Sequence, residues 1–271
     1  AVYPSGSFAT PLGDVQVDEK LCKSLIKASP IFESNVGAHR REHSLEVQLP
    51  FLMRIFKAPF KIVPIVMNTG DLDTAVKIGE ALAKAIRGKN VLIVVSSDFS
   101  HYPPKDIARK ADLTILESLK RLDPAYFRLT NTILMRRGEK NLQTMACGEA
   151  AIIAGMTAAV RLGADKAVLL EYTNSGEVRP QTAQRVVGYG AMAFVKTGEP
   201  LPESFPLAGS GKKILLKTAR QAIVDAFDKK PYDSELSSNI TMNMPAAVFV
   251  TLTISGGLRG CIGTTQPQMS L

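Results

Sequence analysis

The chain has 271 residues, of which 45% are hydrophobic, and its formal net charge at pH 7 is +8. This length and composition suit a globular protein of one large or two smaller domains, which excludes a disordered or fibrous chain. The basic residues are scattered in pairs with carboxylates nearby, and Trp is absent. Because a nucleic-acid surface needs a continuous basic stripe and aromatic side chains for stacking, we expect no nucleic acid partner.

Cysteine usage and apolar runs indicate the compartment. Cys22, Cys147 and Cys261 lie far apart and form no CxxC pair, which favours a reducing environment. The longest apolar runs, at residues 91–95 and 150–160, are shorter than a membrane span, and no leader-like segment opens the chain. We therefore predict a cytoplasmic protein without a membrane anchor.

Residues 61–95 have the pattern of a βαβ unit. An apolar segment at 61–68 is typical of a strand, and 71–86 is typical of a helix with one apolar face. Five branched aliphatic residues at 91–95 then predict a second strand, buried on both faces. Since a helical crossover joins parallel strands, the sheet is predicted to contain parallel strands.

Further helices and strands follow in the same region. Helices are predicted at about 105–121, after Pro124 and at about 148–162. Strands are predicted at 167–173 and 188–195. Helices that alternate with strands predict an α/β domain with a layered sheet.

A change of composition marks a domain boundary. Residues 197–211 are rich in proline and glycine and have no hydrophobic period, which indicates a linker. After it, a helical pattern from Lys212 and two strands joined by a tight turn indicate the first part of an α+β domain. We therefore predict a first domain at 1–196, a linker at 197–211 and part of a second domain at 212–271. The ends of the chain lead us to expect a processed or incomplete protein.

Polar residues follow the predicted strand at 91–95 directly. Ser97, Asp98 and His101 lie where that strand ends, and sites in parallel α/β sheets lie at the carboxyl ends of strands. Asp98 and His101 could orient a metal ligand, act as a base or bind an anion. Alternatively, Asp98 caps the next turn and His101 bonds to a backbone carbonyl. The spacing alone leaves both interpretations open.

A second cluster matches a zinc-peptidase motif. His39, Glu42 and His43 spell H-x-x-E-H, in which two histidines one helical turn apart bind zinc and the Glu activates water. Intervening arginines and a preceding glycine suit such a helix poorly. The favoured interpretation is a helix that begins near Arg41 and is kinked or ended by Pro50, with Glu42 and His43 at its start.

Cys147 precedes a predicted helix that Gly148 opens. A thiol at a helix N-terminus has a lowered pKa, which suits a thiolate that binds a metal or attacks an electrophile. A small, inert, buried cysteine is the alternative. The same two interpretations apply to Cys261, which glycines flank.

Several short motifs together carry a family resemblance. The segments TPLGDVQVD, EHSLEVQLPFL, VVSSDFSHY, CGEAAI and YTNSG resemble, in this order, the Memo family, known in prokaryotes as AmmeMemoRadiSam system protein B. The segments LLKTARQAI and GGLRGCIGTTQP resemble the start of the AMMECR family, or AmmeMemoRadiSam system protein A. The chain thus resembles an internal piece of a Memo–AMMECR fusion.

The Memo resemblance implies a fold and a cofactor. The fold would be like that of the class III extradiol dioxygenases, with an iron or copper ion bound by two histidines and a cysteine. That cysteine corresponds to Cys147, whereas the two family histidines would lie before Ala1. Asp98 and His101 correspond to catalytic pocket residues. Glu42, His43 and Ser97 correspond to the pocket lining and its charged rim.

Two functions from different classes remain. The first is a metal-dependent, redox-active protein that works on an unknown substrate with a radical SAM enzyme, a partner that the system name implies. The second is a non-catalytic module that binds a peptide or a small anion in the same pocket. A zinc peptidase through His39, Glu42 and His43 is the weakest alternative.

Overall fold

The computed structural model describes residues 1–199, 209–230, 236–255, 257–267 and 269. The chain divides into two compact units. The first unit consists of Ala1–Ser97 and Gly148–Ala164, and the second consists of Asp98–Cys147 and Asp165–Leu271. Within the described residues, no helix has the length and apolar character needed to cross a bilayer.

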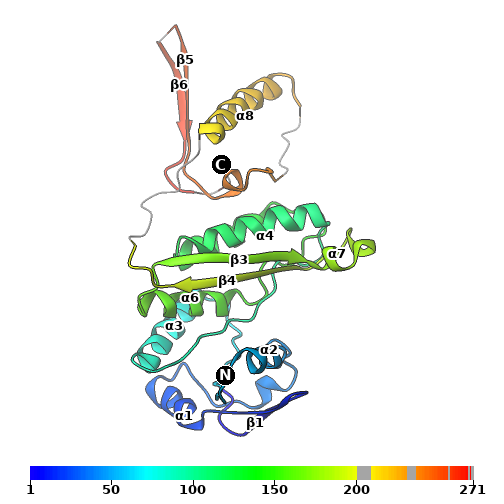
Figure 1. The fold of residues 1–271 in the computed structure, drawn as a ribbon. Coiled ribbons are helices and arrows are strands. Elements are labelled where there is room, and N and C mark those ends of the chain that lie inside the picture. The colour runs from blue at the N-terminus through cyan, green and yellow to red at the C-terminus, as the bar shows by residue number, and fades with distance from the viewer. Residues whose placement is uncertain (200–208, 231–235, 256, 268, 270–271) are drawn as a thin grey trace. The chain divides into compact units, whose positions relative to one another are not determined.

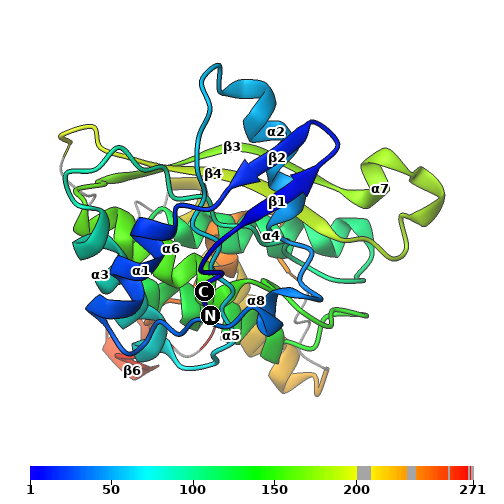
Figure 2. The same ribbon diagram turned by 90° about the horizontal axis from the view of Figure 1, so that it is seen from below.

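The first unit contains one hairpin and a set of helices. In chain order these are β1 (Ser7–Thr10), β2 (Gly13–Gln16), α1 (Glu19–Ala28), η1 (Gly37–His39), η2 (Glu46–Gln48), α2 (Leu49–Ile55), α3 (Leu72–Ile86) and α6 (Glu149–Arg161). Helix α3 packs against both α1 and α6 (Figures 1 and 2). Val2, Leu25, Ile78 and Ala154 belong to the buried core that these elements share.

The helix predicted at 71–86 is confirmed as α3. Asp71 is its N-cap, and the Asp71 carboxylate accepts a hydrogen bond of 2.8 Å from the Thr74 amide. This bond satisfies one of the amides that have no partner inside a helix start. At Gly79, an added Cβ would meet the carbonyl oxygen of Ala154 and lie 2.6 Å from Cβ of Thr157. Glycine therefore allows the close approach of α3 and α6.

The helix predicted near Arg41 begins later than expected. Residues 41–45 form turns, bends and irregular backbone, and α2 begins at Leu49 with Pro50 in its first turn. The prediction that Pro50 kinks or ends this helix is therefore wrong. Proline suits the first turn, because the amide that it lacks would have no helical partner there.

The second unit holds the longest pair of strands. Its elements are α4 (Lys105–Leu119), α5 (Pro124–Arg136), β3 (Lys166–Asn174), α7 (Ser175–Val178), η3 (Pro180–Thr182), β4 (Gly188–Val195), α8 (Gly209–Phe227), η4 (Ile240–Asn243), β5 (Phe249–Ile254) and β6 (Gly257–Gly263). The predictions of helices for α4, α5 and α6 and of strands for β3 and β4 are confirmed. Strands β5 and β6 pair antiparallel, as the predicted tight turn requires.

Helix α4 packs on the antiparallel pair β3–β4 (Figure 1). Glycines in β4 make room for it. A Cβ at Gly190 would lie 2.9 Å from Phe99 and 3.0 Å from Leu116 of α4, and a Cβ at Gly188 would collide with the carboxylate of Asp112. Side chains at these two positions would force the helix away from the strands.

The two strands predicted to be parallel do not form. The sheets in the described part of the chain are three antiparallel pairs. Residues 61–68 contribute only isolated bridges, for example Ile62 with Val17, and residues 91–95 form no strand. Val91 and Leu92 are 41% and 65% exposed. The prediction was wrong because an apolar run forms a buried strand only beside a backbone partner, and no described segment pairs with 91–95.

The fold class is therefore mixed α/β with small sheets, as predicted at that level. The layered sheet expected for the first domain is not formed by the described residues. The predicted linker at 197–211 lies largely outside the described residues, since 200–208 are not among them.

Candidate metal centre

The segment that carries Asp98 and His101 is held along the start of β4. The Phe99 amide donates to the Gly188 carbonyl, and the Gly188 amide donates to the Ser100 carbonyl, both at 2.9 Å. The Tyr102 amide donates to the Val186 carbonyl at 2.6 Å. The segment therefore makes strand-like backbone bonds although it forms no regular strand. This pairing gives Asp98 and His101 a defined place in the second unit.

A second set of backbone bonds brings the loop before Cys147 to the same segment. The His101 amide donates to the Thr144 carbonyl at 2.8 Å, and the Gln143 amide donates back to the His101 carbonyl at 3.1 Å. Both bonds involve His101, which forms an isolated antiparallel bridge with Thr144, and together they hold the loop against this segment. Cys147 follows Thr144 by three residues and reaches Asp98.

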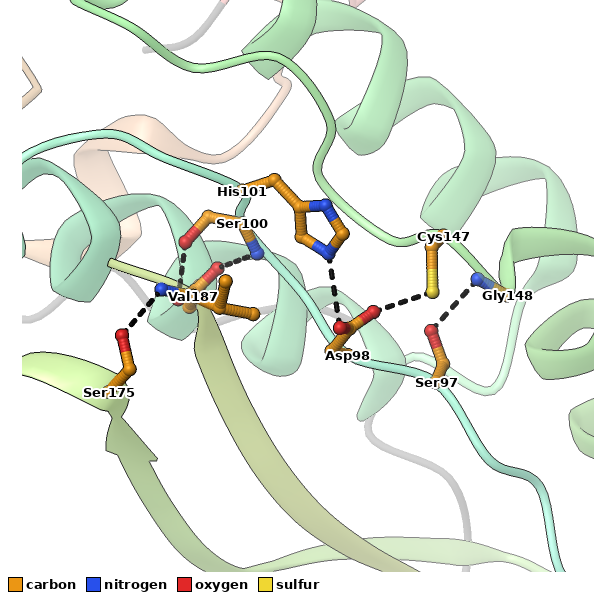
Figure 3. Close-up of polar contacts among 9 residues, drawn as sticks. Ser97, Asp98, Ser100, His101, Cys147, Gly148, Ser175 and Val187 are labelled. Atoms are coloured by element: carbon orange, nitrogen blue, oxygen red, sulfur yellow. Dashed lines mark hydrogen bonds and ion pairs between the residues drawn. The ribbon is translucent and has the colours of Figure 1, made fainter. Parts of the chain in front are cut away.

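Asp98, His101 and Cys147 converge (Figure 3). The Cys147 thiol donates to Oδ1 of Asp98 at 2.6 Å, and Nε2 of His101 lies 3.1 Å from Oδ2 of Asp98. One ligand atom from each side chain lies within 4.8 Å of the other two. Across the described residues, this is the one group of three or more His, Cys, Asp or Glu side chains with such spacing.

The donor set fits a transition-metal ion. It combines a sulfur, an imidazole nitrogen and a carboxylate oxygen, and soft thiolate with imidazole suits copper, iron or zinc. Nε2 of His101 is buried and has no hydrogen-bond partner, because its contact with Asp98 has ion-pair distance without hydrogen-bond geometry. A buried nitrogen without a hydrogen-bond partner is unfavourable, so binding a metal ion there would satisfy it. Cys147 is exposed, so an ion can approach from solvent.

Ser97 contacts the residue after Cys147. Its hydroxyl accepts a hydrogen bond of 2.9 Å from the amide of Gly148, the N-cap residue of α6, in the first unit (Figure 3). A Cβ on Gly148 would lie 2.8 Å from Cβ of Ser97, so this approach requires glycine. The predicted pocket role of Ser97 stays a prediction, while its place beside the start of α6 is observed.

Glu42 and His43 lie in the first unit and make local contacts. Glu42 accepts hydrogen bonds from the amides of His43 and Ser44 at 3.0 and 2.8 Å. Hydrogen bonds from Ser44 hold the pKa of Glu42 below its usual value. His43 Nδ1 lies 2.8 Å from Glu46 Oε1, and His43 is exposed. Their predicted place at a pocket rim stays a prediction.

His39 does not form the helical pair that a zinc peptidase needs. It ends η1, whereas His43 follows in irregular backbone, so the two histidines do not face one another across a helical turn. The His39 ring packs edge-on against Tyr3 at a centroid distance of 5.3 Å. Burial lowers the pKa of His39 and favours the neutral ring.

Sequence reasoning missed Asp112. This residue of α4 is fully buried, and its carboxylate accepts hydrogen bonds from the Ser100 amide (2.9 Å), the Ser100 hydroxyl (2.8 Å) and the Tyr172 hydroxyl (2.9 Å). Burial raises the pKa of Asp112 to about 6, while the hydrogen bonds from Ser100 and Tyr172 oppose the shift. Burial beside the Asp112 charge also raises the pKa of Tyr172. The available signal was an Asp among the buried apolar residues of an amphipathic helix.

Comparison with known proteins agrees with the resemblance of the motifs. A family model described as Memo-like protein matches residues 1–193, and one described as AMMECR1 matches residues 216–271. The two matches lie on either side of the predicted linker.

Curated relatives cover the first of these regions. A MEMO1 family protein of Nitrosopumilus maritimus is 38% identical over 195 residues, which are 72% of this chain and 68% of the relative. MEMO1 family proteins of Methanopyrus kandleri and Methanococcoides burtonii are 34% and 41% identical, over 72% and 68% of this chain and 66% of each relative. The chain thus spans about two thirds of the length of these relatives. From these matches, the chain belongs to the Memo family and continues into an AMMECR1 region.

Proposed function

We propose that this chain is part of a metal-dependent, redox-active protein, in which Cys147 supplies a thiolate ligand beside Asp98 and His101. The observation that carries the proposal is the convergence of these three side chains, with ligand atoms within 4.8 Å of one another. Burial of the His101 nitrogen without a hydrogen bond supports it. The match to the Memo family supports it independently.

Each side chain has a distinct task in this proposal. Asp98 Oδ1 accepts the hydrogen bond of the Cys147 thiol, so it is placed to take the thiol proton when a cation binds the sulfur. The other oxygen of Asp98 lies 3.1 Å from Nε2 of His101, so the carboxylate and the imidazole face the same point, where an ion would bind. A bound iron or copper ion would supply one-electron chemistry and a position for a substrate to coordinate.

The wider setting is proposed from the family resemblance. The resemblance supports a layered, dioxygenase-like fold for the whole protein, a place in the AmmeMemoRadiSam system and action with a radical SAM enzyme. Cysteine usage supports a reducing compartment, which we propose to be the cytoplasm. The substrate is proposed to be a small molecule or a peptide.

Anaerobic titration of the full chain with Co²⁺ tests the proposal. A thiolate bound to Co²⁺ gives an intense charge-transfer absorption in the near ultraviolet, and we expect Cys147→Ser to abolish it. His39→Ala is the matched control, because a zinc peptidase would lose its metal on this change whereas the proposed centre keeps it. Co²⁺ binding without thiolate absorption in the unmodified chain would contradict the proposed centre.

Oxygen uptake after anaerobic iron loading then addresses the redox activity. Uptake that depends on the metal and is lost in Cys147→Ser is the expected result. A loaded protein that takes up no oxygen and binds a peptide or an anion equally well without metal would support the binding module instead.

A further inference from the structure

The buried carboxylate of Asp112 contacts the segment that carries two of the three residues of the centre. Asp112 is 0% exposed, on the face of α4 that also buries Ala108, Ile115 and Leu116. All three of its hydrogen-bond donors are neutral. A charge without a direct cationic partner is costly to bury, so an apolar residue would be the more stable choice at this position.

Two of the three hydrogen bonds go to Ser100. This residue follows Asp98 by two positions and directly precedes His101, and Asp112 receives both its amide and its hydroxyl. The backbone is irregular here, because Gly188 bonds to both the Phe99 amide and the Ser100 carbonyl, so simple alternation of side chains does not apply. Ser100 lies between Asp98 and His101 in the chain, and its two bonds to Asp112 fix the backbone from which these side chains reach toward Cys147 (Figure 3).

The packing around Asp112 supports the same role. A Cβ on Gly188 would collide with Oδ2 of Asp112 and lie 2.6 Å from its Cγ. The backbone of the same glycine bonds to Phe99 and Ser100. Gly188 thus leaves space for the carboxylate and pairs with the segment that the carboxylate holds.

We propose that Asp112 is the positioning residue of the metal centre, holding Ser100 so that Asp98 and His101 face Cys147. The inference rests on the proposed function, since it assigns a purpose to the geometry of that centre. Asp112 does not touch the metal. It acts through Ser100, and the Tyr172 hydroxyl donates to the same carboxylate from β3.

Co²⁺ titration of matched variants of the full chain tests the role. Asp112→Ala should weaken Co²⁺ binding by about 10- to 100-fold, the range for residues that orient ligands, and should shift the thiolate absorption. Asp112→Asn keeps an oxygen for the Ser100 amide and should restore most of the affinity. Tyr172→Phe removes a donor from the same carboxylate and should leave the affinity unchanged. Equal losses in Asp112→Ala and Tyr172→Phe would overturn the proposal.

A second variant and a metal-free measurement keep the test decisive. Ser100→Ala removes only the hydroxyl bond, so it carries the test if Asp112→Ala fails to fold, and we expect weaker Co²⁺ binding in it. Alkylation of the exposed Cys147, followed in a Cys261→Ser background, needs no metal. Both Asp112→Ala and Ser100→Ala should change the rate at which Cys147 is alkylated, and Tyr172→Phe should not.

Co²⁺ titration and Cys147 alkylation together separate the proposed metal function from the positioning role of Asp112. A chain that binds no Co²⁺ refutes the proposed function, and the alkylation rates then decide the positioning role alone. If Cys147 is alkylated in Ser100→Ala and in Asp112→Ala at the same rate as in the unmodified chain, the positioning role is refuted.

Discussion

Asp98 is the residue through which the other two members of the centre meet. One carboxylate oxygen accepts the Cys147 thiol and the other faces His101. Sequence spacing pointed to Asp98 and His101, because polar residues after an apolar run mark a site. It could not show that Cys147, which is 49 positions from Asp98, reaches the same point. That contact depends on the backbone bonds of His101 with Gln143 and Thr144, which leave no periodic signal in the sequence.

Substitution of Asp98 separates a metal role from a structural one. We expect Asp98→Ala to weaken Co²⁺ binding by at least about 10-fold, because it removes the carboxylate that contacts both Cys147 and His101. The free energy of unfolding should change by less than about 1 kcal/mol, since the Asp98 side chain is 32% exposed. Isothermal titration and urea denaturation measure the two effects. Lower stability with unchanged metal affinity would support the capping role instead.

The raised pKa of Asp112 predicts how stability depends on pH. A carboxyl group whose pKa rises from 3.8 to about 6 on folding takes up a proton between these values. Its contribution to stability is therefore fully present below about pH 4 and lost as the pH rises through about 6. The shift corresponds to roughly 3 kcal/mol.

Comparison with Asp112→Asn isolates this contribution. The variant cannot titrate at this position, so the free energy of unfolding of the unmodified chain, minus that of the variant, should fall as the pH rises from about 4 to about 7. Urea denaturation across this range measures it. Parallel pH profiles for the two proteins would show that the pKa of Asp112 is the same in the folded and the unfolded chain.

At the scale of elements, local signals predicted α3 to α6 and the strands of the pairs β3–β4 and β5–β6, but they missed α1 and predicted two strands that do not form. Helix α3 has a cap at Asp71 and an apolar face, both visible in the sequence. The runs at 61–68 and 91–95 have equally strong strand composition, but a strand also needs a partner that no local signal supplies. Strands β3 and β4 do form, because each provides the backbone partners that the other needs.

Close packing between α3 and α6 makes Gly79 a sharp test of the fold. In an exposed helix, Gly→Ala stabilises by about 1 kcal/mol. Here the new Cβ would meet the backbone of Ala154 and the side chain of Thr157, and such overpacking costs about 1–3 kcal/mol. We therefore expect Gly79→Ala to lower the free energy of unfolding. Gly70→Ala is the control, since its Cβ would have no atom within 4 Å. A Gly79→Ala variant that gains stability would show that the helices lie further apart.

At the scale of the whole molecule, the two family matches and the two compact units divide the chain differently. The Memo match ends at residue 193, whereas the second unit joins 98–147 with everything after Asp165. Contacts explain the difference. Helix η4 packs against α4, and the Tyr126 hydroxyl donates to the Pro245 carbonyl at 2.9 Å. Met242 and Met244 are buried. The AMMECR1 region therefore contributes buried residues to the unit that holds the candidate metal centre.

Removal of residues 212–271 tests whether those contacts matter to the centre. Asp98, His101, Asp112 and Cys147 all lie in the region that the Memo model matches, and the contacts that join Asp98 to Cys147 and His101, and Asp112 to Ser100, lie within that region. We therefore expect the shortened chain to bind Co²⁺ with unchanged affinity and the same thiolate absorption. Its free energy of unfolding should fall by a few kcal/mol, about what the burial of two methionine side chains contributes. Loss of the absorption in a shortened chain that still folds, as judged by circular dichroism, would show that the AMMECR1 region takes part in forming the centre.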